Sequence, residues 1–124
     1  MTLGPTEMKL LRGWLVFLGV FEFPNLYNLL VANKRLEGFW STMRNERASK
    51  RCWSFGLALL VFARFQAAAD PTSKSALVHN AAVHILEAVV LGREYMVHGS
   101  KGSAPVMAII ALNAVWFASA AGRL

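Results

Sequence analysis

Long apolar runs separated by short polar stretches dominate the chain. They cover residues 10–32, 53–69, 76–97 and 104–120. At a rise of about 1.5 Å per residue, about 20 helical residues cross a bilayer core of about 30 Å. The pattern therefore predicts an all-α membrane protein, a four-transmembrane-helix bundle with short loops that forms a single domain over residues 1–124.

The first run is interrupted near its middle by Glu22, Pro24 and Asn25. A proline has no backbone N–H and bends a helix, which frees a carbonyl of the preceding turn. A charged residue and a proline at the centre are also atypical of a signal peptide. We therefore expect the run to be retained as a bent span.

The last two runs differ sharply in polarity. A turn signal, Asp70-Pro71-Thr72-Ser73, precedes the third run, which carries a stripe at spacings of 4, 3, 4, 3 and 4 that lies on one side of a helix. The stripe consists of Asn80, His84, Glu87, Leu91, Glu94 and His98. The fourth run is almost wholly apolar, with alanines at three- and four-residue spacings that would let another helix approach closely.

Composition supports a membrane protein. Of 124 residues, 56% are hydrophobic and 16% are charged, and the mean hydropathy is +0.42. These values argue against a self-contained soluble enzyme, a secreted disulfide scaffold or a disordered tail. Cys52 is the only cysteine, so neither an intrachain disulfide nor a multi-cysteine zinc site is available.

The net charge of +6 comes largely from one segment, residues 33–51. Its basic residues are Lys34, Arg35, Arg44, Arg47, Lys50 and Arg51. A basic loop between spans is typical of a topology signal, and we expect Lys34, Arg35, Arg44, Arg47 and Lys50 to contact anionic phospholipid. The positive-inside rule places this loop in the cytosol, or in the matrix of a mitochondrion. No aromatic platform accompanies the charge, so we expect no nucleic acid partner.

Three ionisable residues lie deep in the predicted spans. Glu22, Arg64 and Glu87 each stand about 11 residues into a run, which places them near the bilayer midplane, and His84 lies one turn from Glu87. Because intramembrane charges need a partner or a watery path, three interpretations are open. Arg64 pairs with Glu87 or Glu22 as a structural cluster; the group forms a proton relay or ligand pocket; or Arg64 snorkels toward Asp70 and leaves Glu87 protonated.

No arrangement typical of an active site accompanies these residues. The chain has no Gly-rich loop after a strand, no repeated His box, and no serine or cysteine placed beside an obvious base. A helical di-iron site needs several carboxylates and two Glu-x-x-His pairs, whereas His84, Glu87 and a distant Glu22 supply less. We therefore expect no catalytic residue, no metal site and no cofactor.

An ordered series of residues resembles the ergosterol biosynthetic protein 28 family, small four-span proteins of the endoplasmic reticulum. The series runs from residue 11 to about residue 102 without an obvious gap. It comprises Leu11-Arg12-Gly13-Trp14-Leu15-Val16, Asn25, Arg51, Leu59-Leu60, Arg64, Ala68, Asp70, Lys74, Glu94 and Gly99-Ser100.

This resemblance implies a non-catalytic scaffold that tethers the sterol C-4 demethylation enzymes at the endoplasmic reticulum membrane. Arg12, Arg51, Arg64 and Glu94 are the charged positions that carry over, as structural or partner-binding residues. We assign the same kind of role to Glu22, Asn25, His84 and Glu87, and expect the basic loop and the polar face of the third run to be contact surfaces.

Two other functions remain open from the sequence. The same bundle could serve as an accessory subunit of a respiratory complex or ATP synthase in the mitochondrial inner membrane. It could also be a small transporter or lipid-binding membrane protein that uses Glu22, Arg64, His84 and Glu87 as its pathway.

Overall fold

The computed structural model describes residues 3–32, 34, 47–98 and 103–124, and within these ranges all regular structure is helical. The helices are α1 (Pro5–Phe21), α2 (Phe23–Leu30), α3 (Arg47–Ala69), α4 (Lys74–His98) and α5 (Ser103–Gly122). Three of them are long and apolar enough to cross a membrane, over Ala48–Ala69, Lys74–Val97 and Ala104–Gly122. The all-helical class is thus confirmed, and a helix covers each of the last three predicted spans.

The first predicted span, residues 10–32, is not one helix. It corresponds to α1, with 17 residues, followed by α2, with 8 residues. At the junction the N–H of Glu22 donates to the carbonyl of Gly19 at 3.3 Å, a tightened turn, and Pro24 in the first turn of α2 has no N–H to continue the ladder. The predicted bend is confirmed, but neither helix reaches the length of a span alone.

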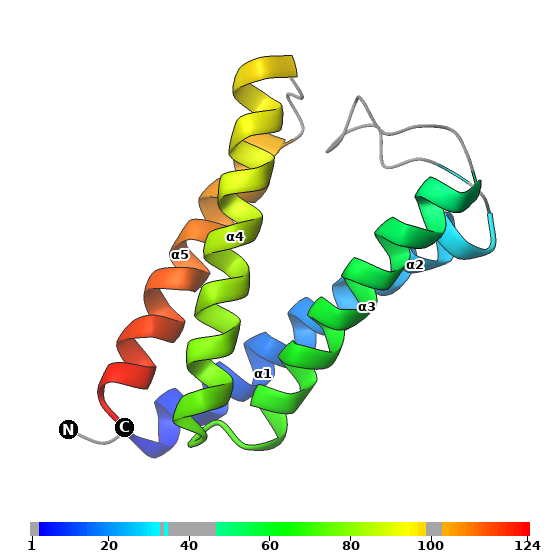
Figure 1. The fold of residues 1–124 in the computed structure, drawn as a ribbon. Helices are drawn as coiled ribbons and strands as arrows, with labels where there is room; N and C mark the ends of the chain where they lie inside the picture. Colours follow the sequence, from blue (N-terminus) through cyan, green and yellow to red (C-terminus); the bar gives the residue numbers. More distant parts are fainter. Residues whose placement is uncertain (1–2, 33, 35–46, 99–102) are drawn as a thin grey trace.

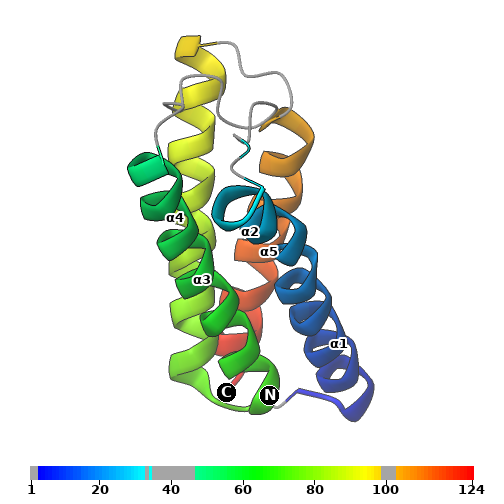
Figure 2. The same ribbon diagram turned by 90° about the vertical axis from the view of Figure 1, so that its right-hand side faces the viewer.

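The helices form two groups that diverge from one end of the molecule (Figure 1). One group pairs α4 with α5, and the other packs α1 and α2 against α3. The groups meet at the end that holds both termini and the turn at residues 70–73, which we call the closed end, and they separate toward the other, open end. Turned by 90°, α1, α3, α4 and α5 run broadly along a common axis, whereas α2 turns away from it (Figure 2).

The apolar core lies at the closed end and draws on four helices. Leu11 and Leu15 of α1, Leu77 of α4 and Phe117 of α5 are fully buried and pack with alanines at the C-terminal end of α3. Between helices in lipid, close packing of such side chains, rather than their removal from water, holds the groups together. The core therefore anchors the closed end.

Polar contacts supplement this core. Arg12 Nε donates to the carbonyl of Ala68 at 3.0 Å, which satisfies one of the last carbonyls of α3. Arg123 pairs with Glu7 through both guanidinium nitrogens, one at 2.6 Å. In the turn, the N–H of Thr72 donates to Asp70 Oδ1 at 3.1 Å, so the predicted turn is confirmed.

Close packing of α1 on α3 depends on Gly19. A Cβ added there would lie 2.5 Å from Cε1 of Phe65. The Phe65 ring also contacts Phe23, with ring centroids 6.1 Å apart in an edge-to-face arrangement. The absent side chain at Gly19 thus allows α1 to approach α3 just before the bend.

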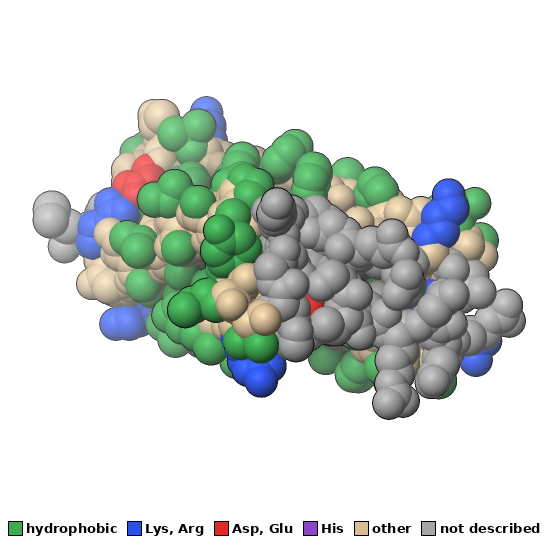
Figure 3. Space-filling view, turned by 90° about the horizontal axis from the view of Figure 1, so that it is seen from above, with side chains coloured by type: hydrophobic (Ala, Val, Ile, Leu, Met, Phe, Trp, Pro, Cys, Tyr) green, Lys and Arg blue, Asp and Glu red, His purple; other side chains and the backbone are tan. Residues whose placement is uncertain are grey.

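Large hydrophobic side chains are exposed on every helix, including Phe17, Leu30, Phe62, Met96 and Leu112. The view from above shows hydrophobic side chains over much of the described surface, with Lys and Arg at separate points (Figure 3). An outward apolar surface of this extent is costly in water and suits contact with lipid.

Candidate functional site: a buried polar cluster beside an apolar cavity

Arg64 of α3 is the centre of the buried polar cluster. Its side chain is 3% exposed, and Nη1 donates to the carbonyl of Leu18 at 2.9 Å and lies 3.4 Å from Glu22 Oε1. Both partners belong to the bend region, where the regular helical ladder ends. Arg64 therefore joins α3 to the junction of α1 and α2.

The other guanidinium nitrogen of Arg64 faces α4. Nη2 lies 3.4 Å from His84 Nε2 and 3.7 Å from Glu87 Oε2. Arg64 thus pairs with both carboxylates, because Glu22 lies near Nη1 and Glu87 lies near Nη2. Glu22 is the closer, and its second oxygen accepts a hydrogen bond of 3.0 Å from Asn25 Nδ2.

The hydrogen bonds of His84 define its tautomer. Nδ1 lies 2.8 Å from the carbonyl of Asn80, which can only accept, so Nδ1 carries the proton. Nε2 is then the lone-pair nitrogen, and it can accept from Arg64. Asn80 in turn donates to the carbonyls of Ala63 and Ala76 at 3.0 and 2.9 Å, which ties α4 to α3.

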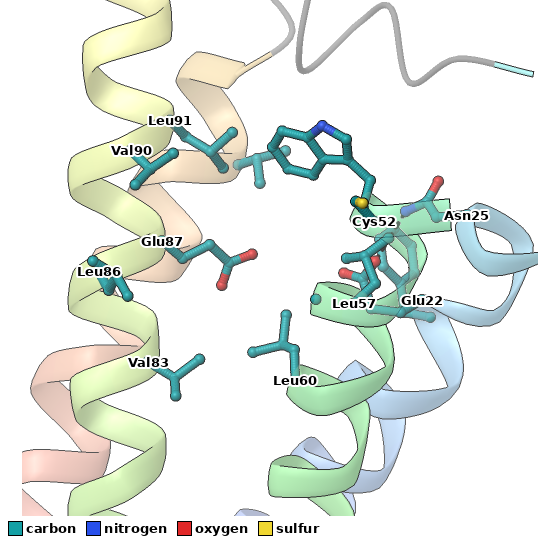
Figure 4. A pocket seen from close by; sticks show the side chains of 14 residues that line it. Glu22, Asn25, Cys52, Leu57, Leu60, Val83, Leu86, Glu87, Val90 and Leu91 are labelled. Carbon is teal, nitrogen blue, oxygen red and sulfur yellow. Dashed lines mark hydrogen bonds between the residues drawn. The ribbon is translucent and has the colours of Figure 1, made fainter. Parts of the chain in front are cut away.

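A cavity of about 470 Å³ opens between the two helix groups beside this cluster. Its walls are mostly apolar, with Leu57 and Leu60 of α3 facing Val83 and Leu91 of α4 (Figure 4). Figure 4 shows the Glu87 carboxylate reaching from α4 across the gap toward α3. A mostly apolar chamber with a few polar groups at one place is typical of sites for small molecules.

The polar stripe predicted on the third run points inward. Asn80 and His84 are fully buried, Glu94 is 3% exposed, and Leu91 is also buried, while the side chain of His98 lies outside the described residues. Burial of these residues by the bundle itself contradicts the expectation that they form a partner-contact surface, whereas the Glu87 side chain of the same stripe is 23% exposed. The snorkelling interpretation of Arg64 is wrong as well, since its guanidinium stays among Leu18, Glu22 and His84.

The predicted lipid-contact residues that the structure describes differ in their solvent exposure. Lys34 is exposed, whereas Lys50 is 1% exposed, so its burial in α3 contradicts the prediction that it contacts lipid headgroups. Arg35, Arg44 and the side chain of Arg47 lie outside the described residues. Arg51 is exposed on the first turns of α3.

One interhelix contact was not anticipated. Trp14 Nε1 donates to Asn113 Oδ1 at 2.7 Å and links α1 to α5. Asn113 is 5% exposed and stands in the middle of the most apolar helix. The position of this asparagine within an apolar run was the sequence feature that could have predicted an interhelix contact, because a polar side chain within a span usually has a hydrogen-bond partner.

Among the described residues, no three His, Cys, Asp or Glu side chains are grouped so that they could hold a metal ion. Comparison of the chain with protein-family models, curated proteins and solved structures found no match.

Proposed function

We propose that the protein is a non-catalytic membrane scaffold that crosses the bilayer four times and resembles the tether of the sterol C-4 demethylation enzymes. The fourth crossing is the combined path of α1 and α2. Both helices pack along α3, which is itself long enough to span. At about 1.5 Å per residue, the 17 residues of α1 and the 8 residues of α2 have helical lengths of roughly 25 Å and 12 Å, so the two together can cross a bilayer core of about 30 Å only if the bend between them is modest.

The scaffold proposal rests on the contacts of Arg12 and Arg64, two of the charged residues on which the family resemblance depends. Arg12 and Arg64 each donate from one helix to a main-chain carbonyl of another, Ala68 and Leu18 respectively. These side chains stabilise the arrangement of α1 on α3, which is a structural role. A scaffold needs such a fixed framework and exposed faces for its partners, and apolar side chains are exposed on all five helices.

Isolation of the tagged protein in a mild detergent, followed by quantitative mass spectrometry, tests the proposal. Recovery of sterol C-4 demethylation enzymes at comparable amounts supports the tether. Recovery of respiratory or ATP synthase subunits at fixed stoichiometry overturns it in favour of an accessory subunit of the mitochondrial inner membrane. Recovery of neither set removes the scaffold proposal.

A pair of charge variants tests whether the basic segment contacts the partners. Lys34→Gln with Arg35→Gln removes two charges after α2, and Lys9→Gln with Lys74→Gln removes two exposed charges near the closed end. We expect the first pair to reduce partner recovery and the second to leave it unchanged. Equal effects of the two pairs would mean that net charge matters and the position of the basic segment does not.

A further inference from the structure

The cavity between the helix groups has a charge imbalance at one edge. Glu22 and Glu87 both line it, and among the residues that the structure describes Arg64 is the one cation found to pair with them. His84 adds no positive charge there, because its Nε2 is the lone-pair nitrogen in the tautomer required by Asn80. Two carboxylates and one guanidinium leave one formal negative charge.

The excess charge belongs mainly to Glu87. Arg64 lies closer to Glu22, at 3.4 Å, than to Glu87, at 3.7 Å, and Asn25 gives Glu22 a further hydrogen bond. Oε2 of Glu87, the oxygen that faces Arg64, is buried and has no hydrogen-bond partner among the described residues, while the side chain as a whole is 23% exposed and lines the cavity. A carboxylate held largely out of water in an apolar setting is costly unless a cation or a proton accompanies it.

From this geometry we infer that the cavity binds a hydrophobic monocation, an amine with an apolar body, whose ammonium group pairs with Glu87. The apolar walls would take the hydrocarbon part, with Leu57 and Leu60 on one side and Val83 and Leu91 on the other (Figure 4). The cavity volume of about 470 Å³ is in the range of small-molecule sites. The inference is independent of the scaffold proposal, because it concerns a ligand inside the bundle.

Gly56 supplies a way to fill the cavity without disturbing the fold. It lines the cavity, and a Cβ added there meets nothing within 4 Å. A leucine at this position of α3 would therefore project into open space and would also favour the helix relative to glycine. Gly13 of α1 offers a matched control, because its Cβ position is equally open and it does not line this cavity.

The test is photolabelling of the full chain in phosphatidylcholine nanodiscs. The probes are dodecylamine with a diazirine in its alkyl chain and the corresponding dodecanol, and the labelled peptides are identified by mass spectrometry. We expect the amine to label residues 52–60 and 83–91 about tenfold more than the alcohol, a ratio equivalent to about 1.4 kcal/mol. Glu87→Gln should lower amine labelling to the level of the alcohol.

The glycine variants complete the design. Gly56→Leu should abolish labelling of both segments, while Gly13→Leu should leave it unchanged. Equal labelling by amine and alcohol would overturn the inference, since a proton would then accompany Glu87 and the cation would have no role. Labelling that survives in both Glu87→Gln and Gly56→Leu would also overturn it. If Glu87→Gln does not fold, Gly56→Leu decides alone whether the cavity is the site.

Discussion

At the scale of single residues, Arg64 shows that a buried charged side chain needs several polar partners. The sequence correctly placed Glu22, Arg64 and Glu87 at a similar depth, because depth follows from position along a helix. It did not identify the carbonyl of Leu18 as a partner, since that contact depends on how α1 approaches α3. Contacts of this kind depend on packing between helices, which the pattern of one helix does not contain.

Replacement of Arg64 by leucine should destabilise the bundle strongly. The change removes the hydrogen bond to Leu18 and leaves the Glu22 carboxylate without its cation. Breaking a buried ion pair from one side typically costs about 3–5 kcal/mol. The thermal midpoint of the detergent-solubilised protein, followed by size-exclusion chromatography with fluorescence detection, should fall clearly below that of wild type.

A compensated variant separates charge from packing at this site. In Arg64→Leu combined with Glu22→Gln and Glu87→Gln no unpaired charge remains, so stability should recover at least partly relative to Arg64→Leu alone. No recovery would mean that the cost came from lost packing and from the hydrogen bond to Leu18. A wild-type midpoint in the single variant would show that Arg64 contributes no stability.

At the scale of helices, the alternation of apolar runs and turn residues predicted most of the architecture. Asp70-Pro71-Thr72-Ser73 separates α3 from α4 as expected, and Ser73 Oγ accepts from the N–H of Ala76 near the start of α4 at 3.3 Å. The structure of the first run was harder to predict. Its length suggested one span, but the break before Pro24 divides it into two shorter helices. Divergence of the two helix groups was not predictable, since it depends on packing at the closed end.

Gly19→Ala should weaken the contact between α1 and α3. The added methyl group would overlap the Phe65 ring, and moving that ring would disturb its edge-to-face contact with Phe23. Overpacking of this kind typically costs about 1–3 kcal/mol. Thermal midpoints of Gly19→Ala and of Gly19→Ala with Phe65→Leu measure the effect, and the second change should recover part of the loss. Additive losses in the double variant would locate the cost elsewhere.

At the scale of the whole molecule, the two ends of the chain are joined by an ion pair. Glu7 near the start of α1 accepts two hydrogen bonds from Arg123, after the end of α5. The hydrogen bonds from Arg123 hold the pKa of Glu7 below its usual value of 4.5. This pair lies at the closed end, outside the predicted spans, so solvent pH reaches it.

The direction of this pKa change sets the pH dependence. A carboxyl group with a lowered pKa in the folded state contributes stability above its usual pKa, and the contribution is lost as the pH falls through the lowered value. Melting midpoints of wild type should therefore decline on acidification more than those of Glu7→Gln. Added salt at neutral pH should narrow the difference between the two proteins. Parallel pH profiles would show that the pair adds no stability.

The number of membrane crossings determines which surfaces face each compartment, and the arrangement of α1 and α2 makes this measurable. Single cysteines at Thr6, Lys34 and Lys74, all exposed positions, are introduced into Cys52→Ser and labelled with an impermeant maleimide in sealed vesicles. If α1 and α2 together cross the bilayer beside α3, we expect Thr6→Cys and Lys74→Cys to be labelled from one side of the membrane and Lys34→Cys from the other. The basic residues around Lys34 place that second side in the cytosol or the matrix.

Labelling of Thr6→Cys and Lys34→Cys from the same side would reduce the crossings to α3, α4 and α5. The α1 and α2 helices would then lie outside the bilayer core, and their packing along α3 would have to change on insertion.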